Sequence, residues 1–260
     1  MRNSLRSTLV AGFLAAPLAV AAEPAVFFPE AQLRMMGLRY APAERDFQWD
    51  GWIGGGVGVL RVRGFTLYGT ADVETIIGNE RRAFDANQAN YHLDVGLKRP
   101  LGGLTAALVF GHVSRHAEDR EKPVAVDWND LAFQLSGPFA KERARFLVSV
   151  GHTTYTSLVG YRFEAVGRLE VDIAKRPWGE TYLAARVRGV TVEPTPELAR
   201  GGFVDVNAEG GIRLQRGART FHLFVGYEHR NDVYILVPGA RDRALFGFRF
   251  GLSDVAPVVP

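Results

Sequence analysis

The sequence predicts an all-β chain that forms a transmembrane antiparallel β-barrel of about 12 strands. The main observation is a long period-two alternation of side chains. Between positions 161 and 173 the odd residues are apolar or small, and the even positions include Arg162, Glu164, Arg168, Glu170 and Asp172. A β-strand places these two sets on opposite faces. After the first two dozen residues no window holds 18 consecutive apolar residues, so helical membrane spans are not expected.

Alternation and turn residues together place each strand in order. The expected strands lie near 32–40, 50–61, 65–77, 89–98, 104–116, 127–136, 144–156, 160–173, 180–191, 202–214, 220–230 and 242–252. The first has the weakest pattern. An even number of strands is needed if both chain ends lie on the periplasmic side, and the first strand completes that number.

The connections between these strands alternate in length. Short ones are expected near 63–64, 99–103, 137–143, 175–179 and 215–218, and longer ones near 41–49, 78–88, 117–126, 192–201 and 231–241. The short connection at 157–159 departs from this alternation. Short periplasmic turns and long extracellular loops are typical of outer-membrane barrels.

The charged faces are expected to line the barrel interior. An arginine facing lipid near the bilayer midplane costs about 2–4 kcal/mol. We therefore expect an interior filled by paired side chains, rather than a wide pore. The charged residues expected to line it are Arg162, Glu164, Arg168, Glu170, Arg186, Arg188, Asp205, Glu209, Arg213, Glu228 and Arg249. Aromatic residues near strand ends predict membrane girdles: Trp52, Tyr91, Trp128, Tyr155, Trp178, Tyr182 and Tyr227. The alternative is a soluble lipocalin-like barrel or sandwich, with the opposite orientation of side chains.

Composition excludes several classes of function. The 260 residues are 47% apolar and 23% charged, so the chain is not intrinsically disordered. The absence of cysteine excludes disulfide scaffolds, thiolate metal sites and cysteine nucleophiles. A formal net charge of only +3 is no nucleic-acid footprint, so no nucleic-acid partner is expected.

The amino-terminal residues predict export. Arg2 and Arg6 precede an apolar stretch from Leu9 to Val20, and Ala19 and Ala21 satisfy the small-residue rule for cleavage. A stretch of about a dozen apolar residues is too short to cross a bilayer. We therefore expect a cleaved signal peptide and a location in a Gram-negative-type outer membrane. The expected segments are the signal peptide 1–21, an N-terminal segment with the first strand 22–49, the barrel 50–252 and a tail 253–260.

One group of residues has the composition of a catalytic site. His112, Ser114 and His116 share a face of the strand 104–116 with apolar residues, and Asn129 shares the apolar face of the next strand. A serine becomes nucleophilic when a neighbouring base takes its proton and a third group orients that base. The predicted roles are Ser114 as nucleophile, His112 as base and Asn129 as orienting acceptor. A lipid-facing site at headgroup depth would meet phospholipid esters.

The His-x-Ser pattern followed by Trp128-Asn129 on the next strand resembles outer-membrane phospholipase A, a twelve-stranded barrel with a lipid-facing Ser-His-Asn triad. The resemblance implies phospholipid acyl hydrolysis, homodimerisation and calcium, although no calcium ligands can be assigned. This chain has Arg115-His116 where that family has Asn-Gly after its serine. The strand Ala244–Leu252 is similar to the aromatic carboxyl-terminal strand of outer-membrane barrels, but the chain continues to Pro260.

Other interpretations stay open. The pattern His112-x-Ser114-x-His116, followed by Glu118-Asp119, also resembles a family of uncharacterised bacterial outer-membrane barrels, which implies only fold and location. A metal shared by His112 and His116 is not expected, because their backbone positions lie roughly 13 Å apart along a strand. The alternative to a hydrolase is a non-enzymatic barrel, either a small-solute conduit or a structural component of the envelope.

Overall fold

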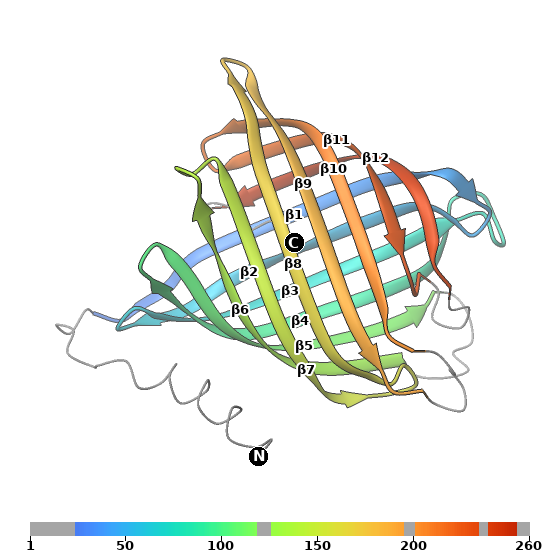
Figure 1. Ribbon diagram of the computed structural model, residues 1–260, viewed down its shortest axis with the longest axis horizontal. Coiled ribbons are helices and arrows are strands. Elements are labelled where there is room, and N and C mark those ends of the chain that lie inside the picture. The colour runs from blue at the N-terminus through green and yellow to red at the C-terminus, as the bar shows by residue number, and fades with distance from the viewer. Residues whose placement is uncertain (1–23, 119–125, 195–200, 234–238, 254–260) are drawn as a thin grey trace.

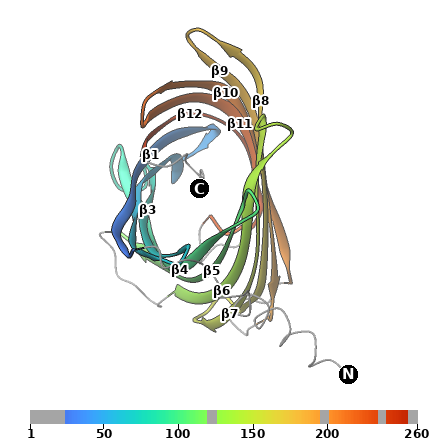
Figure 2. The same cartoon turned by 90° about the vertical axis from the view of Figure 1, so that its left-hand side faces the viewer.

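The computed structural model describes residues 24–118, 126–194, 201–233 and 239–253, which form a closed antiparallel barrel (Figure 1). The strands are β1 Val26–Glu44, β2 Phe47–Val62, β3 Phe65–Gly78, β4 Asp85–Leu101, β5 Leu104–Ala117, β6 Val126–Phe139, β7 Ala144–Thr156, β8 Tyr161–Arg176, β9 Gly179–Val192, β10 Phe203–Arg216, β11 Arg219–Arg230 and β12 Arg241–Ser253. Each strand pairs with its neighbours in sequence, and β1 also pairs with β12 to close the ring (Figure 2). Among the described residues no helix is long and apolar enough to cross a bilayer.

The predicted twelve-stranded fold is confirmed, with one correction to the connections. The segment 41–49, expected as a long loop, is largely strand, because β1 ends at Glu44 and β2 begins at Phe47. A register shift between Arg39 and Glu44 accommodates the extra residues of β1. The expected signal peptide and most of the expected tail lie outside the described residues.

The outer surface of the barrel is apolar. The same alternation runs through β9, where Leu183 and Val187 are exposed on the outside, whereas Arg188 lies inside and donates to Glu164 at 2.8 Å. Each strand contributes at least one exposed apolar side chain to the exterior, among them Leu33, Ile53, Leu67, Val95, Phe110, Leu131, Val150, Leu169, Leu183, Val204, Val225 and Phe246. An apolar exterior around charged inward faces is the distribution of a transmembrane barrel. The chain is therefore an outer-membrane-type β-barrel, and the soluble alternative is wrong.

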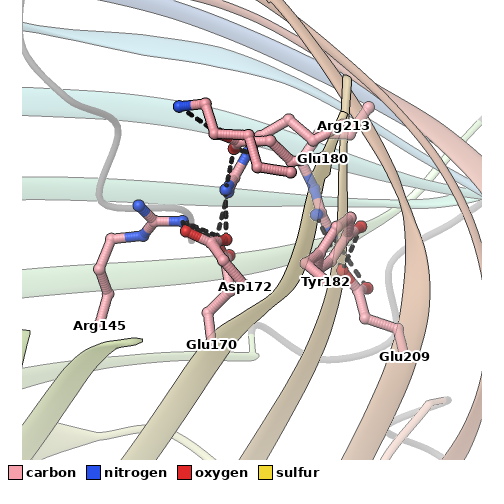
Figure 3. Close-up of polar contacts among 9 residues, drawn as sticks. Arg145, Glu170, Asp172, Glu180, Tyr182, Glu209 and Arg213 are labelled. Carbon is pink, nitrogen blue, oxygen red and sulfur yellow. Dashed lines mark hydrogen bonds and ion pairs between the residues drawn. The ribbon is translucent and has the colours of Figure 1, made fainter. Parts of the chain in front are cut away.

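Ion pairs bridge the interior. Arg230 on β11 contacts Glu74 on β3 at 2.7 Å and Asp50 on β2 at 3.2 Å, so this group connects strands that are not neighbours in the sheet. Towards the short-turn end, Arg213 on β10 contacts a group of carboxylates from β8 and β9 (Figure 3): Glu170 at 2.5 Å, Glu180 at 2.7 Å and Asp172. These contacts agree with the expected pairing of interior charges.

The segment Asn231–Val233, which follows β11, also turns into the barrel. The hydroxyl of Tyr161 on β8 donates to the carboxylate of Asp232. Gln88 on β4 donates to the Val233 carbonyl at 3.3 Å, and the Val233 side chain is fully buried. It belongs to an interior apolar cluster with Leu38, Tyr40, Phe47, Ile76, Phe224 and Leu245. We call Asn231–Val233 the inward segment, because it contacts strands on widely separated parts of the wall.

Two expectations about individual faces need correction. Trp52, Trp128 and Tyr182 point inward and do not belong to a membrane girdle, since Trp52 packs on His92, Trp128 is buried and Tyr182 donates to Glu209. The other expected girdle residues are exposed: Tyr91, Tyr155, Trp178 and Tyr227. Arg162 lies at a register shift in β8, where it is half-exposed and pairs with Glu193, so it does not line the interior.

Candidate functional site

The candidate site lies on the outer face of β5 and β6, near the end that carries the long connections. Along β5, the exposed Phe110 marks the lipid-facing set, and the two-residue period places His112, Ser114 and His116 on that same face. Arg115 belongs to the opposite set and points inward, where it donates to the carbonyl of Asp232 at 2.7 Å. The predicted lipid-facing placement of these side chains agrees with the structure.

His112 and Asn129 meet across the β5–β6 ladder. They are direct register partners, and His112 Nδ1 lies 2.6 Å from Asn129 Oδ1. Because the amide oxygen only accepts hydrogen bonds, the proton of this contact belongs to Nδ1. The neutral ring then carries its lone pair on Nε2. This is the orientation that a general base needs.

Ser114 is paired with a different histidine. Its Oγ lies 2.6 Å from His116 Nε2, and no contact between Ser114 and His112 is found among the described residues. The ring of Tyr91 on β4 packs edge-on against the His116 ring, with centroids 5.1 Å apart. The structure therefore brings together two pairs, His112–Asn129 and Ser114–His116, rather than one continuous triad. The catalytic roles of these residues stay predictions.

Sequence reasoning missed Asp127, which stands directly opposite Ser114 in the β5–β6 register. It shares the outward set of β6 with Asn129 and Leu131. Its Oδ1 atom is buried and accepts no hydrogen bond from the described part of the chain. A charged residue in lipid-facing register at the start of a strand is the signal that could have found it.

Contacts inside the barrel stabilise this end of β5 on the face opposite to the candidate site. The guanidinium of Arg115 lies over the ring of Trp128, 5.4 Å from its centroid, and also binds the inward segment. Trp128 packs at 5.0 Å against Tyr161, which itself binds Asp232. The strands that carry the lipid-facing site are therefore packed on their inner face by Arg115, Trp128 and Tyr161.

The resemblance implies calcium, so the ligand requirements of a metal ion also bear on the described part of the chain. Within the ranges that the structure describes, no group of three or more His, Asp or Glu side chains is arranged to hold a metal ion. Calcium prefers six to eight oxygen ligands. The described acidic and histidine side chains therefore supply no such ligand set for the calcium that the resemblance to outer-membrane phospholipase A implies.

No protein-family model and no curated protein matches the sequence. Among solved structures, the chain is similar to the translocator domain of autotransporter NalP from Neisseria meningitidis, with 9% identity over 95% of this chain and 93% of that one and a TM-score of 0.41. It is also similar to OmpT, an outer membrane protein of Vibrio cholerae, with 8% identity, coverage of 88% and 97%, and a TM-score of 0.41. For OprB of Pseudomonas putida the identity is 7%, the coverage 88% and 94%, and the TM-score 0.40. Likeness this distant concerns the fold alone.

Proposed function

We propose that this barrel, in the outer membrane of a Gram-negative-type envelope, hydrolyses acyl esters of membrane lipids, with Ser114 as the nucleophile. The observation that carries the proposal is the 2.6 Å contact between Ser114 Oγ and a ring nitrogen of His116 on the lipid-facing side. A Ser–His pair in hydrogen-bond contact is the minimal unit of a serine hydrolase. Its position brings it to the ester groups of lipids that surround the barrel.

In the proposed reaction the serine hydroxyl attacks the ester carbonyl while the histidine takes its proton. The bond to the glycerol oxygen then breaks, that oxygen receives the proton, and the acyl group remains on Ser114. Water, activated by the same histidine, releases the fatty acid. His116 is the base in contact, and His112 is the second candidate, because Asn129 already orients it and a rotation of the Ser114 side chain would turn the hydroxyl towards it.

The test is phospholipid hydrolysis in detergent micelles, with and without calcium. Ser114→Ala is expected to reduce the rate to background, and substitution of the true base by glutamine to reduce it about 10²–10⁴-fold. Comparison of His112→Gln with His116→Gln identifies that base. His152→Gln is the matched control, because His152 is exposed on β7 and bonds to the Arg162 carbonyl instead of a serine. Equal rates for wild type and Ser114→Ala would leave the non-enzymatic function.

The non-enzymatic function that we propose as the alternative is a structural component of the envelope rather than a solute conduit. It is favoured by the inward segment and by the ion pairs that join Arg230 to Asp50 and Glu74 inside the barrel. Such a barrel would conduct no ions in a planar bilayer. A stable open conductance of the purified wild type would favour the conduit instead.

Cleavage of the signal peptide and formation of a homodimer are further parts of the proposal, and each can be measured directly. Removal of residues 1–21 would appear in the mass of the protein extracted from membranes. The homodimer would appear as a cross-linked species of twice that mass in detergent.

A further inference from the structure

An arginine inside the barrel has hydrogen-bond donors that the chain leaves unused. Arg186 belongs to the inward set of β9, between the exposed residues Ala185 and Val187. Its side chain is half-buried, and no described residue accepts a hydrogen bond from its guanidinium. The buried side-chain nitrogens that lack a partner belong to other residues, such as Arg243 and Arg249. The N–H groups of Arg186 are therefore open to the lumen.

The carboxylates nearest to this guanidinium are bound by a different arginine. Glu164 and Asp205 are the negative charges that act on Arg186. Arg188 contacts both of them, at 2.7 Å and 3.1 Å. On the other side Arg168, inward on β8, stands directly opposite Arg186 in the register. Like charges directly opposite each other in a sheet are destabilising. Positive charge is therefore in surplus on this part of the inner wall.

A second unused donor lies beside the first. Asn207 on β10 is the other register partner of Arg186, and its half-buried side chain belongs to the inward set. In the described ranges its amide makes no hydrogen bond. Side chains directly opposite each other have Cβ atoms about 4.5–5.5 Å apart, so the amide and the guanidinium can contact one ligand. Glu228 lies beyond Asn207 on β11, where the charges of Arg230 and Arg243 act on it.

We propose that Arg186 and Asn207 bind a small oxyanion in the lumen, either a phosphate or a carboxylate. A guanidinium presents its N–H groups in a planar fork that matches the oxygens of both. The amide of Asn207 adds an N–H donor, and Arg168 adds positive charge behind the site. The site lies on the inner face of β9 and β10. It is therefore separate from the lipid-facing Ser114 and does not depend on the proposed hydrolase function.

Isothermal titration of the purified barrel in detergent, with phosphate, acetate or chloride at one ionic strength, tests the proposal. Saturable binding of phosphate or acetate is expected, and the tighter of the two identifies the class of ligand. Arg186→Gln is expected to weaken the affinity about tenfold. Asn207→Asp keeps the guanidinium but supplies it with a carboxylate, so it is expected to abolish binding. The control Arg34→Gln/Asp72→Asn removes an inward ion pair between β1 and β3 and keeps the wild-type affinity.

Two outcomes of the titration would overturn the proposal. One is equal binding of chloride and of the oxyanions, which would indicate general screening of the lumen. The other is an affinity that survives in Arg186→Gln or Asn207→Asp.

Unfolding by urea gives an independent measurement. The tighter anion is expected to raise the midpoint of the wild type and to leave that of Arg186→Gln unchanged. Without anion, Arg186→Gln is expected to unfold at the wild-type midpoint or above it, because the repulsion from Arg168 is removed. A lower midpoint would mean that Arg186 is already stabilised within the fold, and would contradict the proposed site.

Discussion

Replacing Val187 with arginine tests which side of the barrel meets lipid. Val187 is exposed on the outer face of β9, and its register partners are Gly167 on β8 and Val206 on β10. The outward positions of β9 run from Thr181 to Thr191, so Val187 lies close to the middle of the span. None of these neighbours offers a carboxylate to the new guanidinium. An arginine at the midplane is therefore expected to lower the free energy of unfolding by about 2–4 kcal/mol.

Thr191→Arg is the matched control on the same strand and face. With a rise of about 3.4 Å per residue and a tilt of about 40°, four residues bring the side chain roughly 10 Å nearer the interface. The expected cost there is about 0–1 kcal/mol. Urea unfolding of both variants in phospholipid bilayers, followed by tryptophan fluorescence, measures the difference. Equal costs at the two positions would refute the membrane orientation of the apolar face.

Two further substitutions test the interior. Arg213→Met removes a guanidinium whose side chain is only 6% exposed, and leaves Arg145 and Lys175 to neutralise three carboxylates. The free energy of unfolding is expected to fall by about 3 kcal/mol in the same assay. The control Lys175→Met changes an exposed side chain and is expected to lower it by less than about 1 kcal/mol. Similar losses for both would mean that the interior group is fully hydrated. Gly111→Ala would place a methyl group 2.7 Å from Asp130 Oδ1, and is expected to cost about 1–3 kcal/mol; an unchanged unfolding midpoint would show that this carboxylate moves freely.

The fold followed from the sequence because alternation and turns act locally. Each expected strand is present, and the ion pairs lie on the predicted faces, as for Arg249 with Glu209. The differences occur where the period of two is interrupted, or where closeness to a strand end and the period of two indicate opposite faces. Arg162 lies at a register shift. Trp52 and Trp128 lie near strand ends, as girdle residues do, but the alternation of their strands places them inside.

The site was predictable in its location and only partly in its contacts. The period of two predicts that His112, Ser114 and Asn129 lie on one face of the sheet. The pairing of β5 with β6 then brings the His112 ring into contact with the Asn129 amide. The serine has histidines two residues before and after it on that face, and sequence alone cannot decide towards which one its hydroxyl turns. The structure shows His116. The position of the inward segment could not be predicted from the sequence either, because the depth to which a loop enters a barrel depends on distant partners such as Tyr161.

The pairing of β1 with β12 has a consequence for assembly. The seam joins Gln32 to Ser253 and continues to Ala41 and Ala244, so the ring is completed by contacts between segments near the two ends of the chain. Until then both strands present unpaired backbone groups, which invite aggregation. Contacts of such long sequence separation also form slowly. We therefore expect the exported polypeptide to need protection by a holding chaperone, and insertion to finish only when the final hairpin arrives.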